Sequence, residues 1–146
     1  MAERQILKQQ VCFALYSTSR SFTAFYRPML EELGLTYPQY LVLMLLWEQD
    51  RASVTELGEA LQLDSGTLSP LLKRLESSGL IRRRRSNDDE RRVEIELTDD
   101  GVAMQRRASA IPAQLAEAAG IGIEELTQLC ATLSKLNASL RHVTTQ

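Results

Sequence analysis

The sequence predicts a mostly helical fold that contains one small β-hairpin. Apolar residues recur at helical spacing along most of the 146 residues, and glycine and proline are scarce. One segment differs, because residues 92–97 contain the alternating run Val-Glu-Ile-Glu-Leu, which is typical of a half-buried strand. The basic segment 81–85 precedes it, and the polar, turn-prone residues 86–90 lie between the two. We therefore expect segments 81–85 and 92–97 to pair as a hairpin.

Apolar residues at near-helical spacing predict a first helix over residues 6–26. These apolar positions are Leu7, Val11, Leu15, Phe22 and Phe25. Pro28 is expected to interrupt the helix, because proline lacks the backbone N–H that a helix interior needs. A short continuation over residues 29–33 should then end at Gly34.

The next two helices have recognisable start signals. Pro38 suits the first turn of a second helix that runs through Trp47. Ser53 and Glu56 have the spacing of a capping box, in which the serine hydroxyl accepts from a backbone N–H and the glutamate reaches back. This box should open a short helix that ends near Leu61.

Capping residues also bound the helices on either side of the hairpin. Asp64 is a good N-cap for a helix from Ser65 to Ser78, and Gly79 suits the position just beyond its end. After the hairpin, Thr98 should cap a long helix that runs to about Ala119.

The segment Gly120-Ile121-Gly122 should end that long helix, because two glycines in three residues favour a break. Residues 124–142 then form the last helix. No internal repeat is present.

Charge is distributed unevenly along the chain. The net charge is −2, yet residues 64–95 carry eight Lys and Arg against six Asp and Glu. The remainder of the chain is therefore acidic. A basic stripe on an acidic body indicates a polyanionic partner.

Several classes of site are not expected. No run approaches the ~18 apolar residues of a membrane span, and no signal peptide is recognised, so we expect a cytoplasmic protein without membrane contact. The single histidine and two distant cysteines, Cys12 and Cys130, form no metal-binding cluster and no nucleophilic triad, and no cofactor is expected. In a reducing compartment both cysteines should be thiols.

The order of elements matches a helix-turn-helix with a wing. A helix over 53–61, a turn at Gln62-Leu63 and a helix over 64–78 are followed by the basic hairpin. Small polar residues at the start of the second helix let its backbone approach DNA, and its N–H groups can bind phosphate. The candidate DNA-binding residues are Ser65, Gly66, Thr67, Ser69, Lys73, Arg74, Arg83, Arg85, Asp89, Arg91 and Arg92.

Residues 53–101 resemble the MarR family of winged-helix regulators. The matching segments are Leu57-Gly58, Ser65-Gly66-Thr67-Leu68, Leu75-Glu76-Ser77-Ser78-Gly79-Leu80-Ile81, Asp89-Glu90-Arg91-Arg92 and Leu97-Thr98-Asp99-Asp100-Gly101. The resemblance implies that the helix over 65–74 reads the major groove and that Arg91, in an Asp-x-Arg signature with Asp89, reaches the minor groove. It also implies a homodimer, whose two-fold symmetry predicts a palindromic operator in double-stranded DNA.

This resemblance gives a domain assignment. Residues 1–146 form a single MarR-type domain, in which 6–50 and 99–142 are dimerisation helices. Residues 51–98 form the winged helix-turn-helix region.

Cys12 lies at the edge of an aromatic segment, because all eight aromatic residues fall between Phe13 and Trp47. Its residue type alone favours a small buried hydrophobe. Segments 11–16, 26–28 and 35–40, however, resemble the organic-hydroperoxide-sensing OhrR branch of the same family. The resemblance implies that Cys12 is a redox-sensing thiolate, that Tyr26 and Tyr37 hydrogen-bond it, and that Tyr16 lines the pocket.

Helix geometry restricts how these residues can meet. Tyr16 is four residues from Cys12 and shares its helix face. Tyr26 is fourteen residues on, which is roughly 21 Å along a continuous helix. Either the helix bends sharply or Tyr26 comes from the partner subunit. We favour the second, which places the sensing site at a dimer interface.

The chemistry implied is oxidation of Cys12 by an organic hydroperoxide to a sulfenic acid, which condenses with another thiol. Cys130 lies in an apolar run that favours a core residue, while two-cysteine members of the branch use a C-terminal thiol from the other subunit. Cys130 or a small thiol could therefore resolve the sulfenic acid.

We expect a transcriptional repressor that leaves DNA when Cys12 is oxidised. The reaction is stoichiometric signalling, so we do not expect an enzyme. The alternative is a MarR-type repressor induced by non-covalent binding of a small aromatic ligand at the dimer interface. Thiol peroxidase and architectural DNA-binding functions explain less of the sequence.

Overall fold

The computed structural model describes residues 2–89 and 91–145, without the side chains of 2–5 and 7–9. Two expectations therefore lie outside the described residues: the apolar side chain of Leu7 and the part of Glu90 in the turn. The chain divides into two compact units, Met1–Ala108 and Ser109–Gln146. No helix in the described part is both long and apolar enough to cross a membrane.

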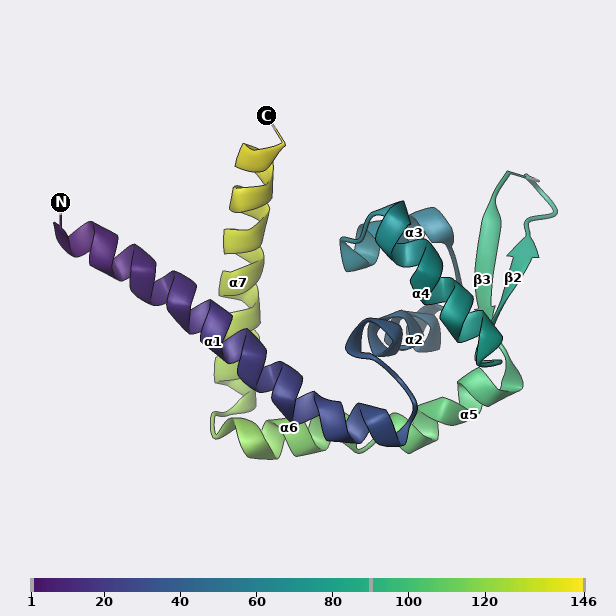
Figure 1. Cartoon of the computed structure of the whole chain (residues 1–146), viewed down its shortest axis with the longest axis horizontal. Helices are drawn as coiled ribbons and strands as arrows, with labels where there is room; N and C mark the ends of the chain where they lie inside the picture. The colour runs from purple at the N-terminus through teal and green to yellow at the C-terminus, as the bar shows by residue number, and fades with distance from the viewer. Residues whose placement is uncertain (1, 90, 146) are drawn as a thin grey trace. The chain divides into compact units, whose positions relative to one another are not determined.

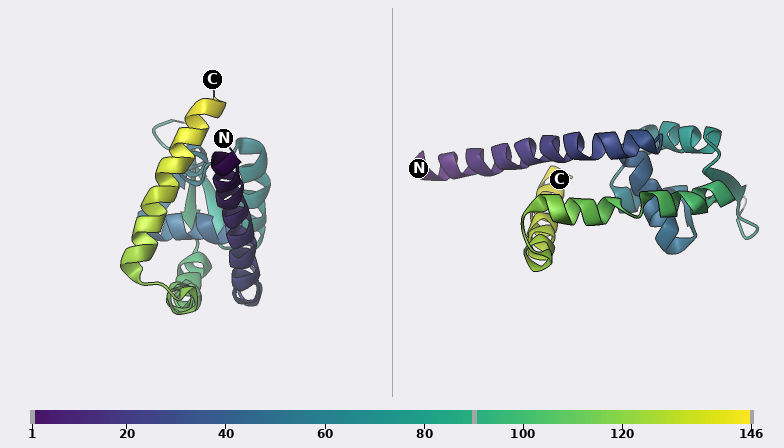
Figure 2. Two further views of the ribbon diagram at one scale, coloured as in Figure 1. Left: turned by 90° about the vertical axis from the view of Figure 1, so that its left-hand side faces the viewer. Right: turned by 90° about the horizontal axis from the view of Figure 1, so that it is seen from below.

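Helix α1 (Ala2–Glu32) runs through Pro28 without a break, which corrects the predicted interruption (Figure 1, and the right-hand view of Figure 2). Proline removes one helical hydrogen bond, but the residues beyond it are held by tertiary packing. Leu30 is 3% exposed, and α1 contacts α2 there. Gly34, with φ +70°, follows the last turn as predicted.

The core of the first unit is built on α2 (Tyr37–Gln49), which Thr36 and Gln39 cap with a complete capping box. Val42, Leu43 and Leu46 on α2 are fully buried. Helix α3 (Val54–Leu61) begins at the predicted capping box of Ser53 and Glu56, and α4 (Ser65–Ser77) begins at Asp64. The buried leucines of α3 and α4 complete this core: Leu57, Leu68, Leu72 and Leu75.

The hairpin is present and is part of a three-stranded antiparallel sheet. Strands β2 (Ile81–Arg85) and β3 (Val93–Leu97) pair as predicted, with Arg83 opposite Ile95. A third strand, β1 (Arg51–Ser53), pairs with the other edge of β3 and was not predicted. Three residues are too few to show strand periodicity, so only pairing with β3 reveals β1.

The predicted long helix over 99–119 is wrong, because the structure contains two helices there. Helix α5 (Asp99–Ala108) belongs to the first unit, and α6 (Ile111–Ala119) to the second. Pro112 lies in the first turn of α6, where its missing N–H is tolerated, whereas a continuous helix would need that N–H. Gly120 ends α6 as predicted, and α7 (Ile123–Thr144) follows.

Helix α4 begins with a titratable cap, which makes its stability dependent on pH. The carboxylate of Asp64 accepts a hydrogen bond of 2.7 Å from the backbone N–H of Thr67, and this bond lowers the pKa of Asp64. A lowered pKa stabilises the folded state above the unfolded pKa of about 4. That contribution is lost as the pH falls through the folded pKa.

We expect Asp64→Asn to reduce the acid sensitivity of the protein, because asparagine caps helices well and does not titrate. Urea unfolding of wild type and variant at about pH 6 and about pH 3 measures this. The wild type should lose more unfolding free energy on acidification than the variant. Glu56 and Glu96 titrate in both proteins, so equal losses would show that the Asp64 cap contributes nothing.

Candidate DNA-binding surface and thiol sensor

The face of α4 that points away from the core carries the predicted DNA-binding residues. Leu68, Leu72 and Leu75 are buried, and the polar positions between them are exposed. These exposed positions are Ser65, Gly66, Thr67, Ser69, Lys73 and Arg74. The helix start is therefore free to approach a phosphate backbone with its N–H groups.

An open recess joins this face of α4 to strand β2. Ser69, Pro70 and Lys73 line it from α4 together with Glu76, and Arg83 lines it from β2, around about 640 Å³ of space. The Arg83 Nε lies 3.9 Å from a carboxylate oxygen of Glu76. The structure thus brings two of the predicted DNA-binding cations, Lys73 and Arg83, to one recess.

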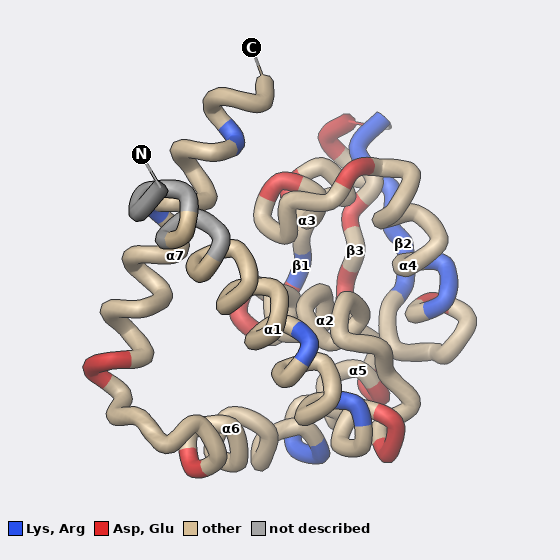
Figure 3. Tube along the Cα trace, turned by 60° about the vertical axis from the view of Figure 1, so that its left-hand side comes forward, with Lys and Arg blue, Asp and Glu red and all other residues tan. Residues whose placement is uncertain are grey.

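The wing is the hairpin β2–β3 with its loop, residues 81–97, and basic residues follow β2 along it (Figure 3). The backbone N–H of Ser86 donates to the Arg92 carbonyl at 2.9 Å, which closes the loop. The Asp89 carboxylate accepts from the backbone N–H of Arg91 at 3.0 Å. This bond is a physical reason for an aspartate two residues before an arginine, because it orients the backbone that carries Arg91.

The arginines of the wing have different surroundings. Arg92 donates to a carboxylate oxygen of Glu56 on α3 at 2.6 Å, and its Nε lies 3.9 Å from Glu94. Arg85 and Arg91 form no ion pair with any side chain in the described part of the chain. The partner of Arg92 lies 36 residues away and has no sequence signal.

Three tyrosines of α1 and α2 form an aromatic cluster. The ring centroids of Tyr26 and Tyr37 are 5.0 Å apart, and Tyr40 lies 6.4 Å from Tyr26. Burial, with a smaller contribution from the neighbouring tyrosines, raises the pKa of Tyr26 and of Tyr40. Tyr40 was not among the predicted site residues, although its spacing of three from Tyr37 on a helix was a signal for it.

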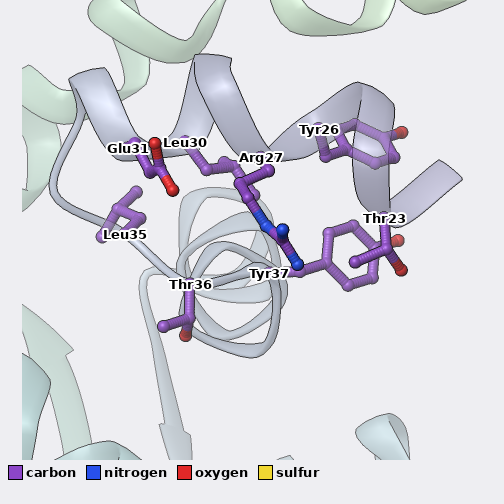
Figure 4. Close-up of a pocket in the computed structure, with 8 residues that line it drawn as sticks. All are labelled: Thr23, Tyr26, Arg27, Leu30, Glu31, Leu35, Thr36 and Tyr37. Carbon is purple, nitrogen blue, oxygen red and sulfur yellow. The ribbon is translucent and has the colours of Figure 1, made fainter. Parts of the chain in front are cut away.

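A recess of about 230 Å³ lies beside this cluster, between α1 and the start of α2. Figure 4 shows the rings of Tyr26 and Tyr37 on one side of it, with the side chain of Arg27 extending toward Tyr37. The lining residues are Thr23, Tyr26, Arg27, Leu30, Glu31, Leu35, Thr36 and Tyr37. The recess therefore combines an aromatic wall with one cation.

Within one chain the structure does not bring Cys12 to these tyrosines. Helix α1 is continuous from Cys12 to Tyr26, so the two lie roughly 21 Å apart along its axis. The thiol of Cys12 and the ring of Tyr16 are exposed, and Arg20 lies over that ring at 5.7 Å. The sharp bend considered above is absent, and so is burial of Cys12 in the core of its own chain.

The second thiol, Cys130, is also exposed in the single chain, so the expectation of a core position there is wrong. It lies on α7, which has no buried residue in the described part of the chain. Apolar side chains of both terminal helices are exposed: Val11, Phe13, Leu15 and Phe22 on α1, and Leu129, Leu136, Leu140 and Val143 on α7.

Comparison with known proteins decides the family. The model of the SarA/Rot transcriptional regulators matches residues 24–107, more than half of the chain. The organic hydroperoxide resistance transcriptional regulator of Bacillus subtilis (strain 168) is 48% identical over 134 residues, which are 92% of this chain and 91% of that protein. The chain belongs to the MarR family of winged helix-turn-helix regulators.

Solved structures of a MarR-type relative confirm the fold class. AbfR of Staphylococcus epidermidis is 36% identical with a TM-score of 0.78, covering 99% of this chain and 97% of that chain. Overoxidised AbfR bound to DNA is 37% identical with a TM-score of 0.80, covering 98% and 99%. Disulfide-formed AbfR is 42% identical with a TM-score of 0.68, covering 90% and 94%.

These relatives also determine the class of function. They are transcriptional regulators and not enzymes. This MarR-family chain is accordingly a DNA-binding transcriptional regulator.

Proposed function

We propose that this MarR-family regulator is a repressor that senses organic hydroperoxides through Cys12 and then releases its operator. The observation that carries the proposal is the separation of two half-sites in one chain. An exposed thiol lies near one end of α1, and a tyrosine cluster beside a recess lies near the other end. The names of the relatives, an organic hydroperoxide resistance regulator and an overoxidised regulator on DNA, support the same chemistry.

A two-fold dimer would complete the site. The exposed apolar side chains of α1 and α7 need a partner surface, and a second copy of the chain supplies the same faces. In such a dimer Tyr26 and Tyr37 of the partner subunit can meet Cys12, with Tyr16 beside it. Residues 6–50 and 99–142 are then dimerisation helices, and 51–98 is the DNA-binding region.

The proposed reaction consumes one hydroperoxide for each thiolate. The sulfur of Cys12 attacks the outer peroxide oxygen, the O–O bond breaks, and the alkoxide leaves and takes up a proton to become an alcohol. The sulfur is oxidised by two electrons to a sulfenic acid, and the hydroperoxide is reduced. A second thiol then attacks that sulfur, forming a disulfide and releasing water. This thiol is Cys130 of the partner subunit or a small thiol.

Oxidation is transmitted to DNA through the dimer. The oxidised sulfur no longer fits the hydrogen bonds of the tyrosines, so the interface shifts. Two recognition helices must reach half-sites about 34 Å apart on a palindromic operator. A small rotation of one subunit therefore moves the α4 residues and Arg91 out of register.

A second candidate function has one observation in its favour. Arg27 beside the aromatic recess forms no ion pair with any described residue, and a cation beside tyrosine rings suits a small aromatic acid. Such a ligand would induce release without covalent change.

DNA binding in the presence of each class of inducer tests the proposal. The probe is a duplex selected by the reduced wild-type protein from random-sequence DNA. Equimolar cumene hydroperoxide should release it, hydrogen peroxide should act more weakly, dithiothreitol should restore binding, and peptide mass spectrometry should find the oxidation at Cys12. Release by benzoate with no effect of hydroperoxide would support the second candidate and overturn the first.

A further inference from the structure

The capping boxes of α2 and α3 differ in one informative way. In α2 the side-chain oxygen of Gln39 accepts from the backbone N–H of Thr36 at 2.9 Å. In α3 the corresponding oxygen belongs to Glu56 and accepts from Ser53 at 2.8 Å. The neutral amide of Gln39 does this work in the same chain, so capping does not require the charge of Glu56.

The second oxygen of Glu56 has a different partner. It accepts from a terminal guanidinium nitrogen of Arg92 at 2.6 Å, while the first oxygen remains on Ser53. The backbone N–H of Ser53, followed by Arg92, lowers the pKa of Glu56, so the carboxylate is charged at neutral pH. One side chain thus binds both the start of α3 and the wing.

Arg92 is the residue at which the wing loop meets β3. Its carbonyl accepts from Ser86 and its N–H donates to Asp89, so both of its backbone groups close the loop. Fixing the Arg92 side chain on α3 therefore fixes the base of the loop that carries Arg91.

We propose that Glu56 and Arg92 form a brace that holds the wing at the angle needed for DNA, so that Arg92 is a positioning residue and not a DNA contact. This inference rests on the proposed contact of Arg91 with DNA. It corrects the assignment of Arg92 to the DNA-binding residues and gives Glu56 a role that capping does not explain.

The brace predicts an effect on DNA affinity that net charge cannot produce. The double variant Glu56→Gln/Arg92→Gln removes the ion pair, keeps the capping oxygen and leaves the net charge unchanged. We expect it to bind the selected duplex about three- to fivefold more weakly, because half-exposed ion pairs are worth little more. The slope of affinity against salt from about 50 to 200 mM should not change, because no phosphate contact is lost.

Single variants give the sign. Glu56→Gln alone frees a cation beside DNA, yet the brace predicts weaker binding, whereas a phosphate-binding Arg92 predicts tighter binding. Arg92→Lys, which retains the cation, should keep most of the affinity. Wild-type affinity of the double variant, tighter binding of Glu56→Gln, or a salt slope lowered by about one in Arg92→Gln would overturn the brace.

Two controls complete the experiment. Arg82 and Glu96 form another ion pair of 2.6 Å within the same hairpin. The charge-neutral Arg82→Gln/Glu96→Gln variant should stay within about twofold of wild type. An equal loss there would show that no specific brace exists. Arg91→Ala should lose about tenfold or more, and an unchanged affinity would instead refute the wing contact on which the inference rests.

Discussion

Cys12→Ser is expected to bind the selected duplex with an affinity within about twofold of wild type, because the residue lies on the exposed part of α1 and outside residues 51–98. The same variant should retain DNA at hydroperoxide concentrations that release wild type completely. A serine hydroxyl has nearly the shape of the thiol but cannot be oxidised to a sulfenic acid. Anisotropy titrations with and without cumene hydroperoxide measure both properties.

Cys130→Ser is the matched control, because Cys130 is the other exposed thiol of the chain. It should still release DNA on oxidation, since the first step needs only Cys12. If the partner's Cys130 is the resolving thiol, the variant should lose the intersubunit disulfide on a non-reducing gel. Release of Cys12→Ser by hydroperoxide would show that another residue is the sensor.

Gly101→Ala is expected to cause the largest loss of stability that one added methyl group produces in the first unit. A Cβ at Gly101 would lie 2.1 Å from the carbonyl oxygen of Leu80 and 3.0 Å from a methyl carbon of Leu97. The obstructing atom is backbone, and the carbonyl of Gly101 also accepts from Trp47 Nε1 at 3.0 Å. Helix α5 would have to move away from both the strand and α2.

The expected cost is about 3 kcal/mol or more, because backbone must shift to accept the added group. For a chain of this size that lowers the melting temperature by about 10 °C. Thermal unfolding at one fixed protein concentration measures it, since dimerisation makes the transition depend on concentration.

Gly66→Ala provides the control for Gly101. A Cβ there meets only a side-chain oxygen of Asp64 at 3.4 Å, which is ordinary contact, and alanine favours helix more than glycine does. Its stability should equal or slightly exceed that of wild type. A melting temperature of Gly101→Ala equal to that of Gly66→Ala would contradict the close approach of α5 to Leu80.

The prolines show where sequence reasoning succeeds and where it fails. Pro38 begins α2 as predicted, because a proline in a first turn needs no partner elsewhere. Pro28 was expected to interrupt α1, but the buried Leu30 holds the helix beyond it. Pro112 was expected to lie within a helix and instead lies in the first turn of α6. The same residue type has opposite consequences, depending on which neighbours pack around it.

The sequence by itself determined the helix-turn-helix and its wing, because their signals are local. The capping bonds of Ser53, Asp64 and Thr98 each span three residues, and the alternation in β3 repeats every two. Only the tertiary structure decided the pairing of β1 and the contact between Glu56 and Arg92. These contacts join segments tens of residues apart, and no local pattern of hydrogen bonds or hydrophobicity records which distant segment will be the neighbour.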